Sequence, residues 1–260
     1  MLLKDVIAEL EQLSPPAFAE EWDNSGLMCG NSQAEVSSVL LSVDATDEVV
    51  EEAVLSGAEL LLTHHPLIFP QIRHITDQDI VGRRLLKLIS GGVACYAMHT
   101  NFDVIGMADE AADRLGLLER EVLQVTCEDA IAKEGIGRVG RLKAPMRLKD
   151  CAGLVKESFI LENVRVFGDP EKKITRAAIS PGSGKDMISD AIKAGAEVLI
   201  TGDIGHHDGI DAVATGLSII DAGHYGLEKI FVEYMKDFFR RKLPQLNVSA
   251  ASQKEPFVTM

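Results

Sequence analysis

The chain has 260 residues, 46% of them hydrophobic and 25% charged, which is enough apolar material for one large domain or two smaller ones. Its 40 acidic residues exceed its 26 basic ones, and the formal net charge of -14 disfavours direct binding to a nucleic-acid backbone. The basic residues at 236–242 are expected to form a solvated helix end. The first residues mix charges into the apolar positions, and no stretch approaches about 18 apolar residues. We therefore expect a cytoplasmic protein without a membrane span.

Helical and extended patterns alternate from the N-terminus onward. Residues 2–13 have the apolar spacing of an amphipathic helix that stops at Pro15-Pro16, and the segment WDNSGL (22–27) is typical of a turn. Apolar runs at 39–43, 59–62 and 93–98 are separated by segments with helical periodicity. This alternation predicts an α/β fold with a largely parallel sheet.

The chain contains an internal repeat. The segment 43–65 (VDATDEVVEEAVLSGAELLLTHH) resembles the segment 179–203 (ISPGSGKDMISDAIKAGAEVLITGD), and both read as strand, turn, helix, Gly-Ala-Glu, strand. A second strand led by glycine follows in each half, at 92–103 and at 216–228, and each ends in a His with a carboxylate four residues later. The pattern predicts two similar α/β lobes from an internal duplication, with layered sheets flanked by helices. We place the first lobe at 1–128, the second at 129–245 and a C-terminal tail, frayed or packed on a partner, at 246–260.

Two glycine-rich segments resemble nucleotide-binding motifs without their context. GIGRVG (135–140) has no preceding strand and following helix with an acidic residue at the right distance, so a glycine-containing strand is expected. GSGK (182–185) lacks the first Gly and the final Ser or Thr of a phosphate loop, so a turn at a helix start is expected. The four cysteines, Cys29, Cys95, Cys127 and Cys151, are too scattered for a metal knuckle or a disulfide framework and are expected to be reduced core residues.

Most histidines fall just beyond predicted strand ends, the edge at which open α/β sheets bind ligands. His64 and His65 leave one strand in THHP, and the segments HTNFD and GHYGLE follow two others. Neutral imidazole and carboxylate groups are ligands that Zn, Fe, Mn and similar ions accept, although a satisfied loop histidine or a surface ion pair would explain each motif alone. Taken together, the motifs predict a site for two divalent ions (Zn, Fe, Mn, Ni or Mg), with Glu228 bridging them. The predicted ligands are His64, His65, Asp103, His224 and Glu228.

Other polar residues near these motifs are candidates for supporting roles. Asp203, His206 and His207 in TGDIGHH occupy the place that THH occupies in the first half, and we expect them to contact the ligands or a substrate. His99 and His207 are the candidate catalytic residues, each as a proton carrier.

The motifs WDNSGL, THHPLIF, HTNFD, TGDIGHHD and GHYGLE, in this order, resemble those of the NIF-three-like dinuclear metal proteins, also called GTP cyclohydrolase 1 type 2 homologs. The resemblance runs from about residue 2 to residue 239. It implies that the five ligands bind two divalent ions with Glu228 bridging, that His99 lies near the site, and that the chain assembles into a ring-shaped homohexamer.

Two functions follow from these predictions. The first is a metal-dependent hydrolase of a small molecule that uses a metal-activated water, of which cyclohydrolase action on a GTP-like purine would be one case. The second is a hexameric protein that binds, stores or senses metal ions without turnover. The hydrolase is the leading hypothesis and the metal-binding protein is the alternative, and the sequence identifies neither the native metal nor a substrate.

Overall fold

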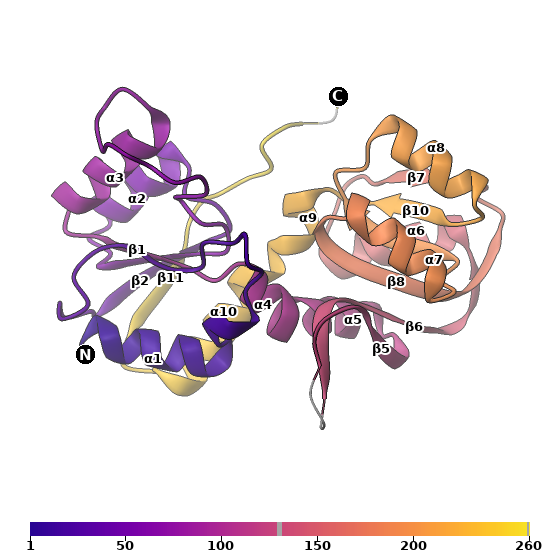
Figure 1. The fold of residues 1–260 in the computed structure, drawn as a ribbon, viewed down its shortest axis with the longest axis horizontal. Coiled ribbons are helices and arrows are strands. Elements are labelled where there is room, and N and C mark those ends of the chain that lie inside the picture. Colours follow the sequence, from indigo (N-terminus) through magenta and orange to yellow (C-terminus); the bar gives the residue numbers. More distant parts are fainter. Residues whose placement is uncertain (129–131, 259) are drawn as a thin grey trace. The chain divides into compact units, whose positions relative to one another are not determined.

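The computed structural model describes residues 1–128, 132–258 and 260, and the chain forms two compact units. Unit 1 consists of residues 1–102 and 231–254, and unit 2 of residues 103–230 and 255–260. Each unit contains one β-sheet flanked by helices, so the predicted α/β class is confirmed (Figure 1). Over the described residues, no helix combines the length and the apolar character needed to cross a bilayer.

Unit 1 contains a five-stranded sheet in the order β1-β4-β3-β2-β11. The strands β4, β3, β2 and β11 run parallel, and β1 is antiparallel to β4 at one edge. Its elements are α1 (Leu3–Leu13), the 3-10 turn η1 (Pro16–Phe18), β1 (Gly26–Cys29), β2 (Ser38–Ser42), α2 (Asp47–Leu55), β3 (Leu60–Thr63), α3 (Ile80–Ser90), β4 (Ala94–Ala97), α4 (Thr100–Phe102), α10 (Ile230–Lys242, apart from its first residue) and β11 (Asn247–Ala250).

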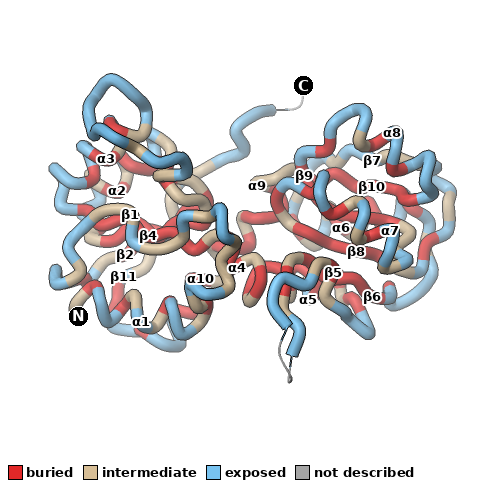
Figure 2. Tube along the Cα trace, viewed as in Figure 1, coloured by how far each residue is buried: buried red, intermediate tan, exposed pale blue. Residues whose placement is uncertain are grey.

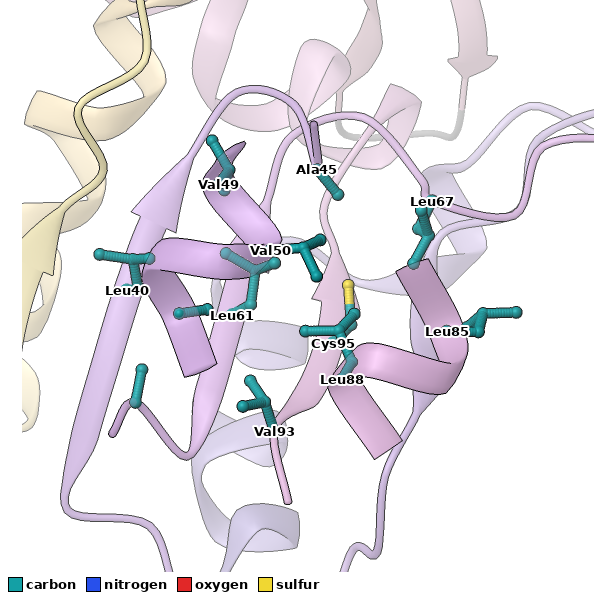
Figure 3. Packing of buried hydrophobic residues seen from close by; sticks show 12 residues of the cluster. Leu40, Ala45, Val49, Val50, Leu61, Leu67, Leu85, Leu88, Val93 and Cys95 are labelled. Carbon is teal, nitrogen blue, oxygen red and sulfur yellow. The ribbon is translucent and has the colours of Figure 1, made fainter. Parts of the chain in front are cut away.

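The helices of unit 1 cover both faces of its sheet (Figure 1). On one face, Leu40, Leu61 and Cys95 from three adjacent strands pack against α2 and α3, which contribute Val50 and Leu88 (Figure 3). On the other face lies α1, whose apolar spacing buries one side of the helix. The predicted helix at 2–13 is thereby confirmed, and it ends before Pro15-Pro16 as expected.

Unit 2 contains a six-stranded sheet in the order β5-β6-β8-β9-β10-β7. Only β8, β9 and β10 are parallel, whereas β5, β6 and β7 pair antiparallel, so the prediction of a largely parallel sheet holds for unit 1 alone. Its elements are the π-helix η2 (Asp103–Met107), α5 (Ala108–Leu115), β5 (Leu118–Glu128), β6 (Lys133–Arg147), α6 (Leu148–Phe159), β7 (Arg165–Phe167), β8 (Lys173–Ser183), the 3-10 turn η3 (Lys185–Met187), α7 (Ile188–Lys193), β9 (Val198–Gly202), α8 (His206–Ala214), β10 (Ser218–Asp221) and α9 (His224–Glu228).

The core strands of unit 2 are buried along their length, while the distal part of the β5–β6 hairpin is exposed (Figure 2). Ala178, Leu199 and Ile219 from β8, β9 and β10 share one face and pack against Ala191 of α7 and Ala212 of α8. The segment GIGRVG lies within β6, and GSGK leads into η3 and α7, as predicted.

The internal repeat corresponds to β2–α2–β3–α3–β4 in unit 1 and β8–α7–β9–α8–β10 in unit 2. The shared Gly-Ala-Glu segment has the same function in both. The Glu59 carboxylate accepts hydrogen bonds from the backbone N–H groups of Ser37 and Ser38, at 2.6 and 3.0 Å, where β2 begins. The Glu197 carboxylate accepts from the N–H groups of Thr175 and Arg176, at 2.6 and 3.0 Å, near the start of β8. Each glutamate therefore ties the entry of its own strand to that of the neighbouring parallel strand.

The predicted division into lobes differs from the observed units. Its boundary between 128 and 129 adjoins residues 129–131, which lie outside the described residues, whereas unit 1 already gives way to unit 2 after residue 102. The segment 118–128 forms β5 and pairs with β6, so it belongs to the second sheet. The predicted tail at 246–260 was wrong in its first part, because β11 adds a parallel strand to β2 in the first sheet.

One of the four cysteines departs from the prediction. All four are free thiols, and Cys95 and Cys151 are buried as expected. Cys29 is half-buried, and Cys127 is exposed because it lies on the exposed part of the β5–β6 hairpin.

We predict that Glu59→Gln lowers the free energy of unfolding by about 1 kcal/mol at neutral pH, because a neutral amide replaces a charged acceptor. The hydrogen bond from the backbone of Ser37 leads the interactions that hold the pKa of Glu59 below its ordinary value of 4.5. Because the pKa of Glu59 is lower in the folded than in the unfolded state, the ionised carboxylate stabilises the fold above the unfolded pKa of 4.5. This stabilisation is lost as the pH falls from there through the folded-state pKa. Thermal unfolding at several pH values should therefore show the wild type and the variant converging in acid. Glu162→Gln, at an exposed position, is the control, and an equal loss in both variants would contradict the role of Glu59.

Candidate metal centre

Unit 1 brings three histidines together at the carboxyl ends of two parallel strands. His64 and His65 follow β3 directly, and His99 follows β4. One ring nitrogen of each lies within 4.8 Å of those of the other two. His64 is fully buried, and the side chains of His65 and His99 are 23% and 13% exposed, so the cluster is closed on one side and open to solvent on the other.

The Nδ1 atom of each of these histidines is held by an oxygen. His64 Nδ1 lies 2.7 Å from the Met98 carbonyl oxygen, His65 Nδ1 lies 2.7 Å from Asp44 Oδ1, and His99 Nδ1 lies 2.7 Å from Asp23 Oδ1. A carbonyl or carboxylate oxygen only accepts, so Nδ1 donates its proton and Nε2 carries the lone pair. This is the tautomer that metal-binding histidines use, with the second nitrogen orienting the ring.

The Asp23 carboxylate organises the loop around His99. Besides the bond from His99, it accepts hydrogen bonds from the Ser25 hydroxyl at 2.7 Å and from the backbone and hydroxyl of Thr100 at 3.1 and 2.6 Å. Burial alone would raise the pKa of Asp23, but the hydrogen bonds from His99, Thr100 and Ser25 outweigh it and hold this pKa well below its ordinary value. Asp23 is therefore ionised throughout the physiological range and keeps His99 in one orientation.

The Asp44 carboxylate is fixed from the C-terminal part of unit 1. Gln253 donates from its amide nitrogen to Asp44 Oδ2 and accepts at its amide oxygen from the backbone N–H groups of Val43 and Asp44, each at 3.1 Å. The loop after β2 is thus held in place by the segment after β11. This segment belongs to the tail that was predicted to be frayed or packed on a partner.

Unit 2 carries a second pair of donors at the end of β10. His224 begins α9, and its Nε2 lies 3.1 Å from Oε2 of the buried Glu228, one helical turn later. His224 Nδ1 lies 2.8 Å from Oδ2 of Asp203, so this ring too is oriented by a carboxylate. Asp203 has φ 57°, in the left-handed region, which places its side chain beside His224 directly after β9.

Close backbone approach shapes this second cluster. A Cβ on Gly202 would lie 2.5 Å from the backbone nitrogen of His224, and one on Gly182, which has φ +82°, would lie 2.7 Å from Glu228 Oε1. Gly202 occupies the repeat position that His64 occupies in unit 1. In unit 2 the backbone at the start of α9 therefore lies where a side chain at position 202 would extend.

The structure assigns different surroundings to the remaining predicted residues. Asp103 is half-buried at the start of η2, directly after α4. His206 and His207 begin α8, are exposed, and contact each other with ring centroids 5.2 Å apart. Among the described residues, neither joins a group of potential ligands. The catalytic role predicted for His207 remains a prediction.

Asp23 and Asp44, which orient two of the histidines, were not predicted from the sequence. The motif WDNSGL was interpreted as a turn, and its aspartate contacts a histidine 76 positions away. The one available signal was the position of Asp44, which follows a parallel strand at the same edge as the histidines.

A two-sheet α/β protein with oriented imidazoles and carboxylates at its strand ends defines the class of candidate metalloproteins, since these donors suit borderline divalent ions. The comparison with known sequences identifies the family: the model of the Duf34/NIF3 family (NGG1p interacting factor 3) matches residues 1–256, and the chain belongs to this family. The resemblance noted in the sequence is thus confirmed.

Relatives and solved structures agree with this assignment. Proteins named GTP cyclohydrolase 1 type 2 homolog from Clostridium perfringens and Clostridium acetobutylicum are 38% and 36% identical to the chain, over 88% and 87% of its length and 87% and 85% of theirs. A Bacillus cereus protein related to NIF3 superimposes with a TM-score of 0.91 at 24% identity, covering 100% of this chain and 99% of that one. A Staphylococcus aureus hypothetical protein gives a TM-score of 0.89 at 30% identity, with the same coverage.

We predict that Asp44→Asn weakens Zn²⁺ binding about 10- to 100-fold, because His65 loses the carboxylate that orients its ring. Competition with a chromophoric chelator measures the change. Asp47→Asn, which removes a carboxylate paired with Arg84 on the surface of α2, is the matched control and should leave the affinity unchanged. Equal affinities in all three proteins would show that Asp44 does not support a ligand.

We further predict that Gly202→Ala destabilises unit 2 by about 1–3 kcal/mol, because the new methyl group overlaps backbone atoms that cannot rotate away. Gly153→Ala is the control, since Gly153 lies within α6 with nothing near its missing Cβ, and it should be neutral or slightly stabilising. Denaturant unfolding of both variants measures the difference. Equal stabilities would contradict the close approach at Gly202.

Proposed function

We propose that this chain is a metal-dependent hydrolase that holds two divalent metal ions through His64, His65, Asp103, His224 and Glu228, with Glu228 bridging. The observation that carries the proposal is the orientation of His64, His65 and His224. Each has its Nδ1 engaged by an oxygen, so Nε2 is the ring nitrogen that would coordinate a cation, and in His224 it lies 3.1 Å from Oε2 of Glu228, another proposed ligand.

The donor set fits a catalytic metal rather than a structural one. Imidazole and carboxylate groups predominate, and none of the described cysteines joins a group of potential ligands. Bound divalent ions would lower the pKa of a coordinated water and polarise a substrate oxygen. The fully buried position of His64 restricts water on its side of the cluster.

His99 is the residue to which we assign proton transfer. Its Nδ1 proton is directed to the Asp23 carboxylate at 2.7 Å, so its Nε2 can accept a proton and later return it. The ionised Asp23 stabilises the imidazolium that forms in between. One ring nitrogen of His99 also lies within 4.8 Å of ring nitrogens of His64 and His65. The competing assignment for His99 is therefore a third metal ligand in unit 1.

The names of the relatives support the choice of reaction class. The relatives named GTP cyclohydrolase 1 type 2 homolog are named after a hydrolytic reaction on a purine nucleotide. We propose hydrolysis of a small molecule by the present chain on this basis, and we propose the homohexamer that the resemblance of the sequence motifs implies. Mass measurement of the native protein tests the assembly.

The test of the metal centre is elemental analysis of the purified protein beside His64→Ala and Asp103→Ala. We expect about two divalent ions per chain in the wild type and a lower content in both variants, because each removes one donor. His74→Ala, which removes an exposed histidine outside the clusters, is the control and should keep the full content. Unchanged metal content in all variants would refute the site.

Glu228→Gln separates a hydrolase from a protein that only binds metal. In a hydrolase, loss of the bridging carboxylate should abolish turnover of a substrate that the wild type hydrolyses. In a storage or sensing protein, the same change should alter metal occupancy with no turnover to lose. A Glu228→Gln protein that keeps its metal and its activity would overturn the proposed mechanism.

A further inference from the structure

Two large aromatic side chains remain exposed beside His99. Trp22 is 59% exposed and Phe69 is 53% exposed, although burial of large apolar side chains is favourable. The ring centroids of Trp22 and Phe69 lie 5.8 Å apart, and both lie close to the imidazole of His99, at 5.9 and 6.1 Å. The three rings form a triangle, with the two apolar members on the solvent side.

Hydrogen bonds of neighbouring residues join the two loops that carry these rings. Trp22 precedes Asp23, whose carboxylate is fully buried among its hydrogen bonds to His99, Ser25 and Thr100. Phe69 follows Ile68, whose carbonyl accepts a 2.6 Å hydrogen bond from the Asn24 amide. The two segments are therefore tied to each other as well as to the histidine, which fixes the part of the backbone from which each ring extends.

We propose that Trp22 and Phe69 form the subsite that binds a planar, uncharged heteroaromatic ring of the substrate by stacking, next to His99. The inference rests on the proposed function only in taking His99 as the neighbouring reactive group. Any planar ring can stack on an aromatic side chain, and each stacked ring contributes substantially to the binding free energy. Stacking needs flat, exposed aromatic faces such as these.

The charges around the pair favour a neutral ring over a cation. A cationic ligand held by aromatic faces gains from a nearby carboxylate, but the Asp23 carboxylate is inaccessible to solvent and is engaged with His99. His99 presents its imidazole at 76° and 74° to the rings of Trp22 and Phe69. A flat ring lying on either exposed face therefore meets apolar surface and an imidazole edge.

The chain contains one tryptophan, so its fluorescence reports on Trp22 alone. We expect adenosine to quench this fluorescence saturably and ribose to leave it unchanged. Phe69→Leu should raise the adenosine Kd about tenfold, because one stacking face is lost. Phe257→Leu, at a comparably exposed phenylalanine outside this cluster, is the matched control and should keep the wild-type Kd.

Three results would overturn the proposal: no saturable quenching by adenosine, equal Kd values in Phe69→Leu and the wild type, or tryptophan emission that shifts to the red on dilution. The last result would show that a second copy of the chain covers Trp22. The same titration on His64→Ala separates this subsite from the metal centre. Quenching that persists in that variant would retain the subsite whether or not the metal centre is refuted by its own test.

Discussion

The arrangement of the candidate metal centre depends on one constraint, namely that the Nδ1 atom of each histidine is engaged by a fixed oxygen. An imidazole on a loop rotates about two bonds and exchanges its tautomers, so a bare cluster of histidines would order only when a cation arrives. Here a backbone carbonyl holds His64, and Asp44, Asp23 and Asp203 hold His65, His99 and His224. The histidine side chains lose their conformational entropy on folding rather than on metal binding, so a cation would meet donors that are already oriented.

The two halves of the repeat use the same edge of the sheet in different ways. In unit 1 the end of β3 supplies two imidazoles. In unit 2 the equivalent strand β9 supplies Gly202 and Asp203, and the imidazole comes from α9 instead. The glycine is needed because the backbone of His224 approaches within 2.5 Å of the position of its Cβ. The scaffold elements, by contrast, are conserved between the halves down to the glutamate that joins neighbouring strands.

The sequence was sufficient for the fold class, the strands and the histidines, because these depend on local periodicity and on motifs of a few residues. The pairing of His224 with Glu228 was predictable from one helical turn. The contacts of Asp23 with His99 and of Gln253 with Asp44 were not, since they join positions 76 and 209 residues apart and no local pattern encodes them. The boundary after residue 102 escaped prediction for the same reason: strand pairing in the tertiary structure assigns 118–128 and 247–250 to their sheets.

Unit 1 is assembled from two stretches of chain, and the later one includes β11 and Gln253. During translation, residues 103–230 leave the ribosome before that stretch does, so the sheet of unit 2 can form while the sheet of unit 1 still lacks its edge strand. Until then, the loop that carries Asp44 has no amide to fix it, and His65 has no oriented carboxylate. The carboxylate that orients His65 is therefore fixed only after the segment that follows β11 has been synthesised.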